Sequence, residues 1–74
     1  MIDKVIEILA EFTEMGTAEM NENTELVNDM GLNSLDVMNV VVAFEDEFDI
    51  EIPDRIIKDL QTIGDIAEYI EKHA

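Results

Sequence analysis

Ser34 is the side chain in this sequence best placed to do chemistry. It lies between a stretch rich in Asn, Thr and Glu and a strongly apolar run from Leu35 to Phe48. A serine just before an apolar periodic stretch is typical of a helix N-terminus. At such a position the hydroxyl either caps its own helix or, exposed at the positive end of the dipole, carries a phosphate group.

Other reactive side chains offer little. The chain has no cysteine, which excludes a disulfide framework and a thiolate zinc site. His73 has no plausible triad partner, and we expect it to be solvated. No base, nucleophile and orienting group occur together, so we do not expect an enzyme. No window has the ligand spacing of an EF-hand, and no metal site is assigned.

The charge is strongly one-sided. Nineteen acids face four bases, for a net charge of −15, and residues 5–54 contain no Lys or Arg. Nucleic acid binding is excluded because phosphate contacts need a basic surface. A basic protein partner or divalent cations fit this surface much better. Such acidity is typical of disordered chains. Here 47% of the residues are hydrophobic and recur with helical period, so we expect the chain to fold.

The length of 74 residues predicts a single domain over residues 1–74 with a modest core. No apolar stretch suggests a signal peptide or a membrane span. We therefore expect a cytoplasmic monomer.

The first apolar segment predicts an amphipathic helix that ends near Met15–Gly16, with the glycine at C′. Its apolar residues are Ile2, Val5, Ile6, Leu9 and Phe12. Residues 17–33 then form a long connection. Four of its apolar side chains are expected to tie it to the core: Leu26, Val27, Met30 and Leu32.

Residues 35–48 predict a second helix with two apolar stripes. The wider stripe is expected to face the core and contains Val37, Val40, Val41, Phe44 and Phe48. The narrower stripe contains Leu35, Met38 and Val42, and runs into Glu45, Asp46 and Asp49. A strand through residues 40–42 is the alternative, because valine is a poor helix former. Fourteen residues without a breaker favour the helix.

Two further helices follow Pro53. Asp54 is expected to cap a short helix containing Ile56, Ile57 and Leu60. Thr62 and Asp65 have capping-box spacing and begin a last helix. Its buried face is expected to comprise Ile63, Ile66, Ala67 and Ile70. The predicted fold class is all-α, a small bundle of three main helices plus one short helix.

Taken together, these segments resemble the acyl carrier proteins of the free-standing, fatty-acid-synthesis type. The resemblance covers nearly the whole chain and is strongest in three stretches, at residues 30–36, 43–54 and 62–70. The first reads Met-Gly-Leu-Asn-Ser-Leu-Asp and holds Ser34, with Asn33, Leu35 and Asp36 around it. The second holds an acidic block followed by Pro-Asp.

The resemblance implies that a phosphopantetheinyl transferase esterifies Ser34 with 4′-phosphopantetheine. The terminal thiol of that arm then holds acyl groups as thioesters. One residue departs from the family pattern, because Asn33 stands where relatives usually have Asp. In relatives that Asp is understood to help hold the magnesium ion of the transferase, and an amide oxygen is the weaker ligand. Loading is therefore expected to be slower, or to need a dedicated transferase.

The resemblance also implies partner enzymes that transfer acyl groups or elongate chains and have basic docking patches. The residues expected to dock are Asp36, Met38, Val42, Glu45, Asp46 and Asp49. It further implies that the core parts to admit an acyl chain. The cargo stays open, since polyketide and aminoacyl carriers fit the same pattern. A different class, an acidic cation-binding interaction module, is the alternative function.

Overall fold

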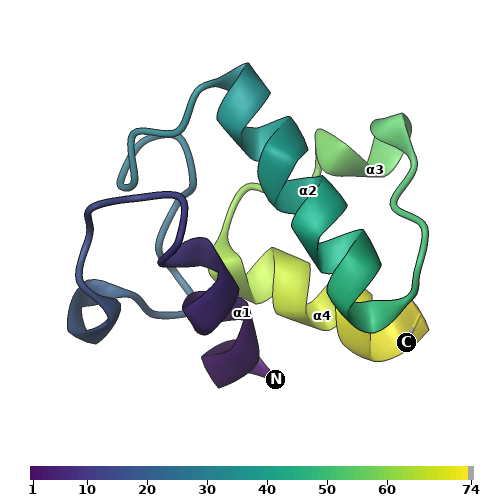
Figure 1. Ribbon diagram of the computed structural model, residues 1–74, viewed down its shortest axis with the longest axis horizontal. Helices are drawn as coiled ribbons and strands as arrows, with labels where there is room; N and C mark the ends of the chain where they lie inside the picture. The colour runs from purple at the N-terminus through teal and green to yellow at the C-terminus, as the bar shows by residue number, and fades with distance from the viewer. Residues whose placement is uncertain (74) are drawn as a thin grey trace.

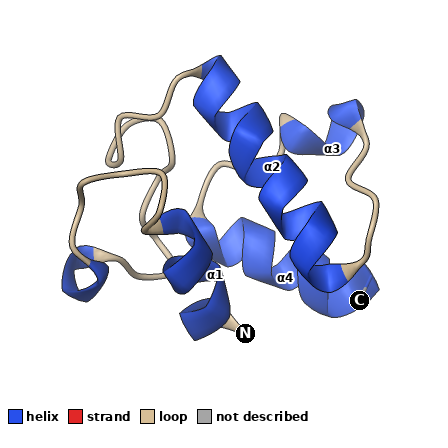
Figure 2. Ribbon diagram, viewed as in Figure 1, coloured by secondary structure: helices blue, strands red, loops and turns tan. Residues whose placement is uncertain are grey.

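The computed structural model describes residues 1–73, and this part of the chain is helical without any β-strand (Figures 1 and 2). Its helices are α1 (Ile2–Leu9), the 3-10 turn η1 (Thr17–Glu19), α2 (Ser34–Phe48), α3 (Asp54–Ile57) and α4 (Ile63–His73). The predicted bundle of three main helices and one short helix is confirmed. Residues 40–42 lie within α2, so the strand alternative is wrong.

Helix α2 crosses in front of α4, and α1 contacts both of these helices (Figure 1). The short helix α3 lies on one side of α2. The long connection between α1 and α2 forms the opposite side of the molecule (Figure 1). The N-terminal end of α2 therefore stands away from α1 and α4, at the edge of the bundle.

The three long helices share one apolar core. Its innermost side chains, each at most 2% exposed, include Val5, Leu9, Val40, Phe44, Ile63 and Ile70. The predicted buried face of α4 is confirmed in full. On α2, Val37 and Phe48 are only half-buried and lie at the margin of the core. Phe48 stacks on Phe44 with ring centroids 6.3 Å apart.

The first helix is shorter than the periodicity predicts. It ends at Leu9, and the next turns tighten to i→i+3 bonds, as in Phe12 N–H donating to Leu9 O at 2.9 Å. The Thr13 hydroxyl accepts from Met15 N–H (3.3 Å) and donates to Met30 O (3.4 Å). Such side-chain bonds compete with helical ones. The predicted end near Met15–Gly16 is therefore wrong.

The long connection is tied to the start of α4 by backbone hydrogen bonds. Leu26 N–H donates to Gln61 O at 3.0 Å, and Ile63 N–H donates to Thr24 O at 3.0 Å. Leu26 is buried, as are two further predicted anchors, Met30 and Leu32. The prediction that Val27 also ties the connection to the core is wrong, because this side chain is 61% exposed.

Helix α3 begins differently from the prediction. Pro53 occupies the N-cap position and Asp54 is the first helical residue, without a side-chain capping bond. The φ of Pro53 is −63°, which is the value that the proline ring imposes, so this residue enters the helix without backbone strain. The capping box at α4 is confirmed. Asp65 N–H donates to Thr62 Oγ1 and Thr62 N–H donates to Asp65 Oδ2, both at 3.1 Å. In the part of the chain described, no helix is long and apolar enough to cross a bilayer.

Gly64 provides a test of how closely the connection packs on α4. Its N–H donates to Glu22 O at 2.9 Å, and a Cβ at this position would lie 2.9 Å from the same oxygen. Gly64→Ala would ordinarily gain helix propensity. Here we expect a loss of about 1–3 kcal/mol in the free energy of unfolding, because backbone atoms must move.

Urea denaturation of Gly64→Ala measures this loss. The matched control is Gly16→Ala, since a Cβ at Gly16 would meet only the Glu19 carboxylate at 3.6 Å, with an ordinary φ of −70°. We expect this control to stay within about 0.5 kcal/mol of wild type. A stabilised Gly64→Ala variant would show that the contact is loose.

Candidate functional site

The start of α2 is held by a reciprocal capping box. Asp36 N–H donates to Asn33 Oδ1 at 2.8 Å, and Asn33 N–H donates to Asp36 Oδ2 at 3.3 Å. Asn33 has an extended backbone and is the N-cap residue. The possibility that Ser34 caps the helix is therefore wrong. Asn is as good an N-cap as Ser, and at residue 33 it has the i, i+3 spacing to Asp36 that closes the box.

Because Asn33 supplies the capping oxygen, the Ser34 hydroxyl stays available. Ser34 is the first helical residue and is exposed. Within residues 1–73, no hydrogen bond engages its hydroxyl. The backbone N–H groups of Ser34 and Leu35 also lack protein acceptors in this part of the chain. Free N–H groups at a helix N-terminus favour an anionic group.

A pocket of about 450 Å³ opens beside Ser34. It lies between the first turns of α2, the connection before that helix, and the segment from the end of α3 to the start of α4. Its lining residues are Glu25, Leu26, Val27, Asn28, Ser34, Val37, Met38, Ile57, Lys58, Leu60 and Gln61. More than half of these side chains are apolar. Asp36 is turned back toward Asn33 and does not line this pocket.

The narrower stripe of α2 is exposed, as the periodicity predicts. Leu35, Met38 and Val42 are 69%, 43% and 50% exposed, and we call them the apolar patch. Asp46 and Asp49 are exposed close by, whereas Glu45 is half-buried. The Glu45 carboxylate accepts from Ile52 N–H at 2.8 Å and so fastens the loop after α2. Glu45 therefore has a structural contact besides its predicted role in docking.

Several site residues were not identifiable from the sequence. The exposed Val27 and the charged Lys58 and Glu25 join Ser34 only through tertiary packing, which no local pattern indicates. Asn33 could have been recognised as the cap from its spacing to Asp36. His73 lies elsewhere, exposed and stacked on Tyr69 with ring centroids 4.1 Å apart.

Within residues 1–73, no three His, Asp or Glu side chains are grouped so that they could hold a metal ion. Only two ion pairs occur among these residues, Lys4–Glu47 at 3.4 Å and Lys72–Glu68 at 3.0 Å. Neither ion pair involves Asp46 or Asp49, the exposed acids close to the apolar patch.

An exposed hydroxyl with free N–H groups beside it, at the mouth of a largely apolar pocket, fits a phosphate-linked arm. The family model for the phosphopantetheine attachment site matches residues 3–70. The chain therefore belongs to the phosphopantetheine attachment family, and its prosthetic group is phosphopantetheine.

Two curated relatives lead to the same conclusion. The acyl carrier protein of Clostridium perfringens is 36% identical over 73 residues, covering 99% of this chain and 96% of the relative. The acyl carrier protein of Wolinella succinogenes is 38% identical over 71 residues, covering 96% and 93%. The function of this chain is that of an acyl carrier, and the alternative of an acidic cation-binding module is not favoured.

We expect Asn33→Asp to speed loading by a phosphopantetheinyl transferase without changing the fold. Asp caps helices as well as Asn does, so the free energy of unfolding should change by less than about 0.5 kcal/mol. A carboxylate at residue 33 is also a better ligand than an amide for the magnesium ion of the transferase, and loading should therefore be faster. Initial loading rates with a transferase of the fatty-acid type, followed by intact mass, measure the effect.

The control for added charge is Asn39→Asp, an exposed position on α2 outside the capping box. Asn33→Ala, which removes the cap, should lose about 1 kcal/mol of stability. Equal or slower loading of Asn33→Asp would mean that Asn33 does not limit the reaction.

Proposed function

We propose that Ser34 is the attachment residue and that the chain carries acyl groups as thioesters on the arm bound there. The observation that supports this most strongly is the exposed, unengaged hydroxyl of Ser34 at the first position of α2. Ser34 is also the only serine of the chain. The arm supplies the thiol that a chain without cysteine lacks, and the chain itself is a carrier rather than an enzyme.

Loading is a transfer from coenzyme A. The Ser34 hydroxyl displaces adenosine 3′,5′-bisphosphate, so one phosphate ester bond forms as a pyrophosphate P–O bond breaks. The serine proton passes to a base of the transferase. The chain contributes an accessible oxygen, and the free N–H groups of Ser34 and Leu35 lie where they favour the phosphate charge. Beyond that point, the apolar wall of the pocket suits the arm and the first part of an acyl chain.

Docking of the partner enzymes is proposed on the face of α2 next to Ser34. An apolar patch surrounded by charges of one sign is typical of a recognition surface. Asp36, Glu45, Asp46 and Asp49 supply the charges, while Met38 and Val42 supply the apolar contacts. The partners are the transferase and enzymes of fatty acid or related biosynthesis with basic patches. A cytoplasmic, monomeric carrier is part of the same proposal.

Ser34→Ala is expected to abolish loading. The test incubates the protein with a phosphopantetheinyl transferase, coenzyme A and magnesium, and reads the intact mass. Wild type should gain one phosphopantetheine, and the variant should gain none. The control variant is Thr17→Ala, an exposed hydroxyl elsewhere, which should load like wild type. Modification that persists in Ser34→Ala would disprove the assignment.

Charge and apolar contacts of the docking face should have separate kinetic effects. Asp46→Lys is expected to slow association with the transferase by about tenfold at low salt, because steering weakens. Met38→Ala should mainly speed dissociation, by about fivefold, equivalent to about 1 kcal/mol. Stopped-flow binding over a range of salt concentrations measures both rates.

Asp46 is a sharper probe than Glu45, since Glu45 also holds the loop at Ile52. The charge-matched control is Glu71→Lys, on the exposed side of α4. If Glu71→Lys slowed association as much as Asp46→Lys, net charge alone would be responsible. Association rates independent of salt would place docking on another face.

A further inference from the structure

This chain has few positively charged side chains, and only some of them form ion pairs. Two of its four Lys and Arg residues, Lys4 and Lys72, are paired with carboxylates. The other two, Arg55 and Lys58, belong to α3 and its C-cap. Within residues 1–73 neither of them takes part in an ion pair. Among the described residues, two of the few cations in a chain of net charge −15 are thus left without an ion pair, on or next to one short helix.

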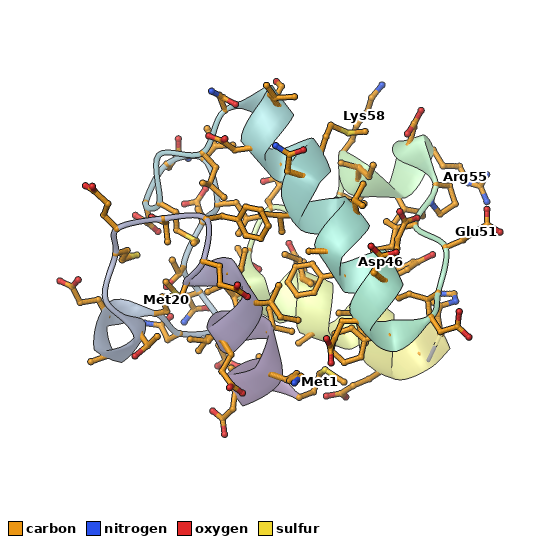
Figure 3. All side chains as sticks on the ribbon, in the orientation of Figure 1. Met1, Met20, Asp46, Glu51, Arg55 and Lys58 are labelled. Carbon is orange, nitrogen blue, oxygen red and sulfur yellow. The ribbon has the colours of Figure 1, made fainter. Side chains whose placement is uncertain are left out.

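The two cations of α3 differ in their surroundings. Lys58 lines the pocket that Ser34 also lines, whereas Arg55 does not. Figure 3 shows Lys58 extending beside the first half of α2, while Arg55 extends on the other side of α3, toward the loop that carries Glu51. Lys58 is the only positively charged side chain in the lining of the pocket, and Glu25 is the only negatively charged one.

An anion must be present at the mouth of this pocket once Ser34 is loaded. The phosphodiester is bonded directly to the serine oxygen, so the covalent link confines it there whatever the rest of the arm does. It adds a further negative charge to a surface whose acidic side chains already repel one another. A lysine ammonium is a point charge on a flexible stem, well suited to reach such a group from across a pocket.

We propose that the Lys58 ammonium binds the phosphodiester of the arm on Ser34. The contact spans the pocket mouth from the end of α3 to the start of α2 and completes a site whose other side is formed by the free N–H groups of α2. It directs the first part of the arm along the wall made by Val37, Met38 and Ile57. This inference depends on the proposed attachment of the arm to Ser34.

The test compares Lys58→Gln with Arg55→Gln, which removes the same charge from the same short helix outside the pocket. Both variants and wild type are loaded by a transferase with coenzyme A and magnesium, and the mass confirms one arm on each. In ³¹P NMR, Lys58→Gln should shift the phosphodiester resonance, and Arg55→Gln should leave it at the wild-type position. In wild type, the ¹H–¹⁵N signal of the Lys58 ammonium should move on loading.

Melting temperatures give a second measurement. The change in melting temperature on loading should be less favourable for Lys58→Gln than for wild type by about 1–6 °C, as expected for one exposed ion pair. The difference should fall at high salt. Arg55→Gln should follow wild type. Equal ³¹P shifts and equal melting differences in the two variants would overturn the proposal.

Two loaded forms of the protein distinguish the two anions that Lys58 could bind, the phosphodiester and a carboxylate on the cargo. The free-thiol form of the loaded protein has only the phosphodiester, whereas a dicarboxylic acyl form adds a carboxylate on the cargo. A Lys58 effect in the free-thiol form supports the proposal, and an effect seen only with the dicarboxylic cargo overturns it. Failure of the wild-type protein to load on Ser34 at all would instead contradict the proposed function.

Discussion

The capping box between Asn33 and Asp36 is the interaction on which the rest of the site depends. Two hydrogen bonds, of 2.8 and 3.3 Å, hold the first turn of α2, and the remainder of that helix places Val40, Val41 and Phe44 in the core. The same box takes the capping task away from Ser34. Ser34 is thereby held at the start of the helix while its hydroxyl makes no capping hydrogen bond.

Much of the fold could be predicted from the sequence because each of the three long helices has a clear apolar periodicity. The buried face of α4 and the two stripes of α2 follow from 3.6-residue spacing alone, and both are confirmed. Helix ends are less predictable since they depend on local competitors. Thr13 bonds to Met15 and Met30 and stops α1 early, a contact that joins residues seventeen positions apart.

The site could be predicted only in part, for a similar reason. Ser34 and the apolar patch are visible in the sequence because they belong to one helix. Val27 and Lys58 lie in irregular segments, where no period distinguishes an inward side chain from an outward one. Their places beside Ser34 result from the way the connection and the end of α3 pack against α2. Tertiary packing, and not local propensity, therefore assembles the pocket.

The C-terminal half of α2 shows what the acidic surface costs. Its last turn has no basic residue, and the helix ends at Asp49, which adopts a left-handed conformation with φ of 54°. Acids at this end oppose the helix dipole, each by about 0.3–1 kcal/mol, and the left-handed backbone suits Gly or Asn better than Asp. The Glu45 carboxylate offsets part of this loss of stability by accepting a hydrogen bond from Ile52 N–H. Among the described residues, Asp46 and Asp49 make no such compensating bond. A small domain with a modest core keeps such a sequence only at the expense of stability, and surfaces that recognise partners are where proteins typically accept that loss. The charges that weaken α2 are thus consistent with the docking role that we propose for this face.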